Sequence, residues 1–385
     1  QEGLFWSGSD DGMVHISRDG GESWQDVTPE GFPDFTLVSI IEPSSHEPGT
    51  AYLAANRYKL DDLTPYLFKT TDYGANWTLI TDGIEADDFA RVIREDPTRP
   101  GLLYAGTETG LYLSFDDGGS WRRWQSNFPV VPVRDMVVKD DDLVIGTHGR
   151  AFWIFDDLAV LRQADSQVLS ASAHLFRPED AVRFREGIAG TPLRGQSPPG
   201  ATGENPPAGA VIWYHLKDAG KTVTLTIRDE SGAEVASFSS QEDPDRVGTP
   251  RNPPPDPIAA DVGLNRFVWD LRYPGPLQIP GAIYRRYDPI GPIAAPGRYE
   301  VEMMTEGFRS TQSFEVLADP RLETTQEEFD ELNRFLLSVR DEITSTHETI
   351  FGIRDLRDRL ELQISSGDPG RAARRDGERV ARELL

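Results

Sequence analysis

Acidic side chains gather in three segments of the N-terminal half of this chain, where they could act in pairs. They are Asp10 and Asp11, Asp61 and Asp62, and Glu108. Two carboxyl groups held about 5–10 Å apart supply the general acid and the base or nucleophile of glycoside hydrolysis. The alternative is that these groups are solvated loop charges, because Asp and Glu are mostly exposed in folded proteins. Both interpretations follow from the same residues.

Four further side chains in the same region have types that favour ligand binding. They are Arg57, Tyr58, His148 and Arg150. Arginine and tyrosine are enriched where protein surfaces bind partners. The alternative is structural, since an arginine beside His148 can equally tie two neighbouring elements together. With the five carboxylates, these residues form the predicted ligand face.

A short pattern of small hydroxyl, aspartate, glycine and tryptophan occurs three times, and we call it the turn motif. The copies are Ser17-x-Asp19-x-Gly21-x-x-Trp24, Thr70-x-Asp72-x-Gly74-x-x-Trp77 and Ser114-x-Asp116-x-Gly118-x-x-Trp121. The aspartate can accept hydrogen bonds from its own turn, the glycine supplies a left-handed conformation, and the tryptophan is expected to be buried. Each copy therefore predicts a tight turn between two antiparallel strands.

The spacing of the motif predicts a propeller. The aspartates are 72 − 19 = 53 and 116 − 72 = 44 residues apart, near the roughly 40–50-residue period of propeller blades. Strands are expected at Phe35–Pro43, Gly49–Asn56, Pro65–Thr71 and Trp77–Thr81, at Phe89–Asp96, Leu102–Thr107, Leu111–Phe115 and Trp121–Gln125, and at Val133–Lys139, Leu143–Thr147 and Ala151–Asp156. This amounts to about 3.5 four-stranded blades, with the innermost strand of the first blade missing. Upstream blades of the parent protein, or of another chain, are expected to supply the rest.

The strand order separates the turn motif from the predicted ligand face. The motif joins the third and fourth strands of a blade, so the loops between the second and third strands must emerge at the opposite side. All nine ligand-face residues lie in or beside those loops. The motif is therefore predicted to be structural, and the opposite side, where propellers usually bind ligands, is predicted to hold the site.

Composition limits the classes of partner. The chain has 385 residues and a formal net charge of −25, so nucleic acid and anionic membranes are repelled rather than attracted. It contains no cysteine, which excludes disulfides and thiolate metal sites. No apolar run approaches the roughly 18 residues of a membrane-spanning helix. We therefore expect a peptide or carbohydrate ligand, with no nucleic acid and no membrane insertion.

The motif and its surroundings resemble a known group, the BNR or Asp-box repeat proteins. The likeness rests on the turn motifs and on the phrases Ala54-Ala55-Asn56-Arg57-Tyr58-Lys59, Val144-Ile145-Gly146-Thr147-His148-Gly149-Arg150 and Phe152-Trp153-Ile154. The chain looks most like large bacterial secreted proteins called glycosyl hydrolase or sortilin-like repeat proteins. The resemblance implies a β-propeller over residues 1–163 and an extracellular or periplasmic location. The resemblance implies no catalytic residue, because the sialidase arginine triad is not assignable in this sequence. The cysteine-rich module that follows a sortilin propeller is also impossible here, because the chain has no cysteine.

The pattern changes after residue 163. Residues 164–209 are predicted to be a connecting segment and a Gly/Pro-rich linker. Alternating strands are then expected at Ala210–Leu216, Thr222–Asp229, Glu234–Ser239, Asn265–Leu271, Gly297–Met304 and Gln312–Leu317. Short strands with turn signals over residues 210–320 predict an immunoglobulin- or fibronectin-like β-sandwich.

Residues 321–385 are predicted to form a helical hairpin. Thr325-x-x-Glu328 is a capping box, and an apolar stripe from Phe329 to Ile364 follows steps of three and four residues, so it is expected to be buried. Ser365-Ser366-Gly367-Asp368-Pro369 is predicted to end the first helix and begin a second through Leu385. Packing on the sandwich and a dimeric coiled coil are the two alternatives for the stripe.

Two functions from different classes fit these residues. The first is a binding protein whose propeller face recognises a peptide or glycan. The second is a glycoside hydrolase, sialidase- or xyloglucanase-like, with catalytic residues partly on missing upstream blades. The chain has no G-x-S-x-G and no H-E-x-x-H pattern, and no cofactor is expected. Calcium at Asp140-Asp141-Asp142 or at Asp61-Asp62 is the one metal hypothesis, because hard cations need only clustered oxygens.

Overall fold

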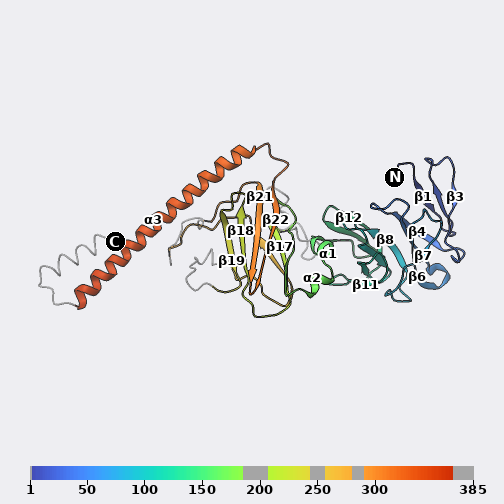
Figure 1. Cartoon of the computed structure of the whole chain (residues 1–385), viewed down its shortest axis with the longest axis horizontal. Helices are drawn as coiled ribbons and strands as arrows, with labels where there is room; N and C mark the ends of the chain where they lie inside the picture. Colours follow the sequence, from blue (N-terminus) through green and yellow to red (C-terminus); the bar gives the residue numbers. More distant parts are fainter. Residues whose placement is uncertain (1, 185–206, 243–255, 280–289, 367–385) are drawn as a thin grey trace. The chain divides into compact units, whose positions relative to one another are not determined.

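The computed structural model describes residues 2–184, 207–242, 256–279 and 290–366. The chain divides into two compact units, one ending at Gln163 and the other beginning at Ala164. Both are mainly β, and a long helix follows the strands of the second unit (Figure 1). No helix among the described residues is long and apolar enough to cross a membrane.

The N-terminal unit contains four antiparallel sheets that follow one another in chain order, each a simple meander. The first sheet has the order β1-β2-β3, the second β4-β5-β6-β7, the third β11-β10-β9-β8 and the fourth β12-β13-β14. The strand bounds are β1 Phe5–Gly8, β2 Val14–Ser17, β3 Gln25–Asp26, β4 Leu37–Pro43, β5 Ala51–Arg57, β6 Asp62–Thr70, β7 Thr78–Leu79, β8 Ala90–Glu95, β9 Leu103–Thr107, β10 Leu111–Ser114, β11 Arg122–Arg123, β12 Val133–Lys139, β13 Asp142–Thr147 and β14 Phe152–Phe155. The 3₁₀ helix η1 covers Tyr58–Leu60 and the helix α1 covers Ala159–Gln163.

β5, β9 and β10 are buried on both faces because neighbouring sheets pack against each other. Every residue of β9 and β10 is buried. One core cluster joins Tyr52 of the second sheet to Leu103 of the third, and another joins Tyr104 of the third to Leu143 of the fourth. The sequence therefore reads as apolar runs in these strands rather than as strict alternation.

The three turn motifs have one hydrogen-bond pattern. In the first, the Ser17 hydroxyl donates to Asp19 Oδ1 at 2.8 Å, and the same oxygen accepts from the backbone N–H of Ser23 at 2.9 Å. The backbone N–H of Gly21 donates to the Ser17 hydroxyl at 2.8 Å, and Gly21 has a φ of 97°, which disfavours a side chain. Asp72 and Asp116 repeat the same bonds to Asn76 and Ser120. The residue before the tryptophan is thus a further member of the motif.

The tryptophans of the second and third motifs connect neighbouring sheets. The indole N–H of Trp77 donates to the backbone carbonyl of Val27 at 2.7 Å, and that of Trp121 donates to the carbonyl of Ile80 at 2.7 Å. Both carbonyls follow the last strand of the preceding sheet. Trp24 differs: its side chain is 47% exposed, so the expectation of a buried tryptophan is wrong for the first motif. The reason is that no described sheet precedes it.

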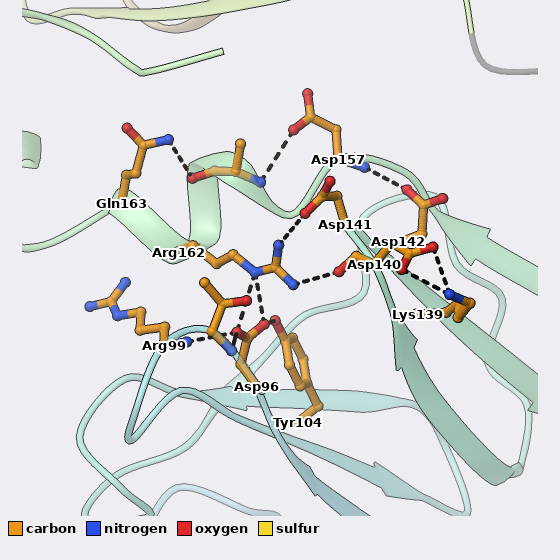
Figure 2. Close-up of polar contacts among 12 residues, drawn as sticks. Asp96, Arg99, Tyr104, Lys139, Asp140, Asp141, Asp142, Asp157, Arg162 and Gln163 are labelled. Atoms are coloured by element: carbon orange, nitrogen blue, oxygen red, sulfur yellow. Dashed lines mark hydrogen bonds and ion pairs between the residues drawn. The ribbon is translucent and has the colours of Figure 1, made fainter. Parts of the chain in front are cut away.

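A buried ion pair fastens α1 to the third and fourth sheets (Figure 2). The guanidinium of Arg162 lies 3.1 Å from a carboxylate oxygen of Asp96 and 2.6 Å from one of Asp141. Asp96 is fully buried and also accepts a hydrogen bond from the Tyr104 hydroxyl at 3.0 Å. Backbone N–H groups of Thr98 and Arg99 donate to the same carboxylate. The Asp96 carboxylate therefore holds the end of the N-terminal unit together.

The C-terminal unit contains two sheets that share one core. Their orders are β15-β17-β20 and β16-β22-β21-β18-β19, and apart from the parallel pair β16 and β22 all pairings are antiparallel. Ile212 and Trp269 of the first sheet lie in the same core cluster as Ile227, Val301 and Phe314 of the second. The bounds are α2 Ser166–Ser170, β15 Ala173–Leu175, β16 Ala181–Arg183, β17 Ala210–Leu216, β18 Thr224–Asp229, β19 Glu234–Ser239, β20 Gly263–Trp269, β21 Gly297–Thr305 and β22 Phe308–Ala318.

Part of the predicted connecting segment belongs to these sheets. β15 pairs with β17, and β16 pairs with β22, so Ala173–Leu175 and Ala181–Arg183 are strands of this unit. Ala173 and Ala181 both enter its core. Each strand is only three residues long, which leaves too little alternation for a sequence pattern to reveal it. Most of the predicted Gly/Pro-rich linker, residues 185–206, lies outside the described residues.

The C-terminal helix α3 spans Gln326–Ser366 as one continuous element. The predicted capping box is present, because the Thr325 N–H donates to the Glu328 carboxylate at 2.8 Å. The apolar stripe is less buried than expected: Phe329 is buried, whereas Leu332 and Val339 are exposed. The second helix of the predicted hairpin lies outside the described residues, and the coiled-coil alternative stays a prediction.

Candidate functional site

Three structurally equivalent bulges interrupt β4, β8 and β12, which are the first strands of the second, third and fourth sheets in chain order. The strand pairing skips one residue between Val38 and Ile40, between Ala90 and Val92, and between Val133 and Asp135. The skipped residues are Ser39, Arg91 and Arg134. A bulge re-aims a side chain and is common beside functional sites. The repeat therefore places one polar side chain per sheet at the same level.

Each bulge residue is held by a partner from its own sheet. Asn56 donates to the Ser39 hydroxyl at 2.7 Å, the Arg91 Nε donates to Glu108 at 2.6 Å, and Arg134 lies 2.9 Å from Nδ1 of His148. The three partners are equivalent as well. In each sheet, the residue just before the bulge pairs with a residue of the next strand, which is Ala55, Thr107 or Thr147. The partner of the bulge residue is the next residue along the chain.

These pairs surround a cavity of about 320 Å³. Its lining residues are Leu37, Ser39, Ile40, Asn56, Tyr58, Arg91, Val92, Arg134 and Asp135. All three bulge residues are among them. The register places this cavity away from the turn motifs, because Ala51 pairs with Thr70 of a motif at one end of the second sheet and Arg57 pairs with Asp62 at the other.

Arg91 is the most enclosed cation of the cavity wall. Its side chain is 8% exposed and lies over two aromatic rings, 5.2 Å from the Tyr58 centroid and 4.6 Å from that of Phe89. Those rings are stacked 5.0 Å apart. Cation–π contact together with the Glu108 ion pair holds the guanidinium in one position. Arg134, in contrast, is exposed, and it can approach a ligand without breaking an ion pair.

The contact with Arg134 fits one role of the His148 ring. A guanidinium can only donate hydrogen bonds, so Nδ1 of His148 is the acceptor in this contact.

The remaining predicted residues lie in three different settings. Asp62 accepts from Arg57 at 2.8 Å and from the Tyr66 hydroxyl at 2.8 Å. Asp61 has a φ of 58° at the end of η1. Asp10 and Asp11 are exposed between β1 and β2, and Arg150 is exposed after β13. Of the nine predicted residues, only Tyr58 lines the cavity, with Glu108 and His148 holding the arginines that do.

Asp62 is kept ionised by its surroundings. Burial raises the pKa of its carboxyl group, but hydrogen bonds from Thr64, Tyr66 and Arg57 outweigh that effect and lower the pKa to about 2. A general acid of hydrolysis needs a raised pKa instead. Asp62 in this setting does not supply a proton near neutral pH.

We expect the stability of the N-terminal unit to fall in acid as such carboxylates are protonated. The folded pKa values of Asp19 and Asp62 are both about 2, below the ordinary 3.8. A depressed folded pKa means that the stabilisation is fully present above about pH 4 and is lost as the pH falls toward 2. Thermal unfolding between pH 2 and pH 6 tests this. Asp62→Asn should flatten the profile, and an unchanged slope in that variant would contradict the assignment.

Ser39, Asn56, Arg91 and Arg134 were not predicted from the sequence as members of the ligand face. The sequence does contain a signal for the bulge residues, since each of them is polar within an expected strand. The intervals between these residues, 91 − 39 = 52 and 134 − 91 = 43, also follow the spacing of the turn motif. Polar residues in a strand normally indicate a solvent-facing side. Only the skipped pairing shows that these three face one cavity.

The acidic run at residues 140–142 is divided among separate partners. Asp140 pairs with Lys139, Asp141 with Arg162, and Asp142 accepts from the backbone N–H of Asp157 at 3.0 Å. Within the described ranges, no three His, Asp or Glu side chains are grouped to hold a metal ion. Calcium binding stays a prediction of the sequence.

Comparison with known proteins gives structural likenesses only. No family model and no curated protein matches the chain. A solved structure of YCF48 bound to D1 peptide is similar over 40% of this chain and 48% of its own, at 16% identity and a TM-score of 0.33. The GH74 xyloglucanase from Xanthomonas campestris is similar over 40% of this chain and 26% of its own, at 20% identity and a TM-score of 0.32. The GH74 enzyme of Niastella koreensis is similar over 56% of this chain and 34% of its own, at 15% identity and a TM-score of 0.32. These neighbours are β-propeller proteins, and this chain spans less than half the length of each.

Proposed function

We propose that this chain is part of an extracellular or periplasmic β-propeller that binds a peptide or glycan in the cavity lined by Ser39, Arg91 and Arg134. In this proposal the four sheets are successive blades, about 3.5 of them by strand content. The C-terminal unit, proposed to be an immunoglobulin- or fibronectin-like sandwich, acts as a scaffold or docking module. Propellers usually bind at the loops around their centre, and this cavity lies at the end of the sheets opposite the turn motifs.

The observation that carries the proposal is the repetition of one side-chain arrangement in three sheets. A bulge costs a ladder hydrogen bond and exposes a polar side chain, so one bulge has little meaning by itself. Here Ser39, Arg91 and Arg134 occur at one structural level, and all three line one cavity. Two of the three carry a positive charge in a chain whose net charge is −25. Local positive charge in an acidic protein favours a ligand with a carboxylate or another acceptor group.

Arg134→Ala tests the proposal with the least risk to folding. Arg134 is exposed, and the side-chain partner that the structure gives it is the His148 ring. A hydrogen bond to a charged group contributes about 1.5–3 kcal/mol, so the variant should bind roughly 10–100-fold more weakly. Isothermal titration calorimetry of the full chain with acidic peptides, neutral peptides and oligosaccharides measures this change.

Arg122→Ala is the matched control, because Arg122 is an exposed arginine on the outermost strand of the third sheet. It should bind like the parent protein. If no member of the panel binds, or if Arg122→Ala and Arg134→Ala lose affinity equally, the cavity is not the ligand site.

A glycoside hydrolase is the alternative function, and the same panel separates it from binding. Hydrolysis predicts release of reducing sugar from a polysaccharide, whereas binding predicts retention without turnover. Among the described loops, Asp62 and Glu108 each form an ion pair with an arginine. For Asp62, the hydrogen bonds that lower its carboxyl pKa to about 2 oppose the proton donation that hydrolysis requires. This arrangement favours the binding function.

A further inference from the structure

The C-terminal unit contains a second cavity, of about 310 Å³. Its walls come from the first half of α3, from Arg183 at the end of β16, and from the two segments joined by the bridge between Arg272 and Ile293. Cavities that bind small molecules begin at about 300 Å³. All of these residues belong to one compact unit, so this cavity is separate from the one between the sheets of the N-terminal unit.

Much of the cavity wall is apolar. Leu336, Val339 and Ile343 line it from α3, and their intervals of three and four residues place them on one face of the helix. Ile290 and Ile293 line it from the neighbouring segments. The three helix residues belong to the apolar stripe expected from the sequence, and Val339 is 40% exposed. This part of the stripe therefore borders a space that can take up further apolar atoms.

The same cavity is lined by three arginines, Arg183, Arg272 and Arg340. Arg272 lies 3.8 Å from Asp270, and Arg340 pairs with Asp341, but both of these carboxylate side chains are 64% exposed. Exposed ion pairs contribute little free energy. An anion in the cavity therefore does not have to displace a buried carboxylate from these two arginines.

Arg183 differs from the other two arginines, because the described residues give it an aromatic ring in place of a carboxylate. Its guanidinium lies 4.7 Å from the centre of the buried Phe329 ring, and its Nε is buried without a hydrogen-bond partner. Burial lowers the pKa of Arg183, and the positive charge of Arg272 acts in the same direction. A buried charge without an anion is unfavourable. Arg183 is thus the group of this cavity that gains most from a bound carboxylate.

We propose that this cavity binds a small aliphatic carboxylic acid, such as a medium-chain fatty acid. The carboxylate pairs with Arg183 and Arg272, because guanidinium N–H groups match the geometry of carboxylate oxygens. The hydrocarbon chain lies against the apolar face of α3 and removes exposed surface from water. This binding site lies in the C-terminal unit and does not depend on the function proposed for the N-terminal unit.

The combination of groups favours this ligand over an apolar partner. The apolar stripe of a second copy, lying on α3, would cover Val339 but would bring no anion into the cavity for Arg183. A simple anion would satisfy Arg183 but would leave the apolar wall bare. An aliphatic acid satisfies both, and the cavity volume fits a small molecule rather than a helix.

An NMR titration of the full chain with four probes tests the proposal. The probes are octanoate, octanol, octylamine and acetate. Octanoate should bind most tightly, because octanol and octylamine lack the negative charge and acetate lacks the hydrocarbon chain. Equal affinity for octanoate and octanol, equal affinity for octanoate and acetate, or no binding of octanoate would each overturn the proposal.

Arg183→Met locates the octanoate site. Methionine keeps an unbranched stem over the Phe329 ring but removes the charge, so octanoate should bind roughly 10–100-fold more weakly. Arg359→Met is the matched control, because Arg359 is a 67% exposed arginine of α3 that pairs with Asp355 and does not line the cavity. It should bind octanoate like the parent chain. An affinity that Arg183→Met leaves unchanged would show that octanoate binds elsewhere.

Val339→Glu gives a second test that leaves Arg183 and its packing in place. The new carboxylate enters the cavity wall beside the arginines, so it should abolish octanoate binding by competing for them. Because Val339 is partly exposed, the variant should keep the melting temperature of the parent chain. Val339→Gln has the same size without the charge and should weaken binding less. Equal loss in the two variants would contradict the role of the arginines, and failure of the Arg134 test would leave these results unaffected.

Discussion

Trp121→Ala is expected to lower the free energy of unfolding of the N-terminal unit by about 3–5 kcal/mol, the usual effect of truncating a buried tryptophan. Trp121 is 3% exposed. Its ring belongs to the core cluster between the second and third sheets, and its indole N–H satisfies the carbonyl of Ile80 at 2.7 Å. The variant leaves a cavity and an unpaired buried carbonyl. Chemical denaturation followed by far-UV circular dichroism measures the change.

Trp24→Ala is the matched control, because the residue has the same place in the motif without a covering sheet. It should change the unfolding free energy of the isolated chain by less than about 1 kcal/mol. Equal losses in the two variants would mean that the tryptophan acts within its own turn and not across an interface. Trp121→Phe keeps part of the apolar contact but removes the hydrogen bond and part of the buried ring, so it should cost more than the roughly 1 kcal/mol of the hydrogen bond and less than Trp121→Ala.

Arg162→Ala is expected to destabilise the N-terminal unit by about 3–5 kcal/mol, because removing one member of a buried ion pair leaves the other uncompensated. Asp96 is 0% exposed and Arg162 is 8% exposed by side chain. Without the guanidinium, Asp96 keeps hydrogen bonds from the Tyr104 hydroxyl and from the backbone N–H groups of Thr98 and Arg99 but loses its ion pair with Arg162. α1 also loses its connection to Asp141 (Figure 2).

The measurement is again the denaturation midpoint, with Lys139→Ala beside it. The pair of Lys139 and Asp140 is more than two-thirds exposed on both sides, so its loss should cost about 0–1 kcal/mol. If Arg162→Ala costs no more than Lys139→Ala, the pair does not fasten α1. Proteolysis near residue 163 gives a second readout, since a released α1 should be cleaved faster.

Strands with a strong local pattern were predictable from the sequence. β17 and β19 begin and end as expected, at Ala210–Leu216 and Glu234–Ser239. β15 and β16 were expected only as part of an extended connecting segment, because three residues carry too little pattern and are held by pairing with distant strands. Within the single chain the α3 stripe is less buried than expected, since helical periodicity shows that one face is apolar and does not show what covers it.

The candidate site was only partly predictable for a related reason. Tyr58, Glu108 and His148, which lie at or beside the cavity, were predicted because loop residues of these types are common at binding sites. Arg91 and Arg134 were missed because they lie within strands, where polar residues are usually assigned to the solvent side. The bulges that redirect them are visible only as a skipped pairing with the next strand, and pairing is not encoded in any single segment.

The sequence by itself determined the repeat of this protein. A serine or threonine, an aspartate, a glycine and a tryptophan at fixed spacing fold one turn through contacts within eight residues, so local chemistry is sufficient. The tertiary structure alone decided which of those tryptophans are buried and which side chains meet in the cavity. Trp24 and Trp121 have the same local sequence pattern and very different exposure. Burial depends on whether a neighbouring sheet is present, and that is a property of the assembled sheets rather than of the turn.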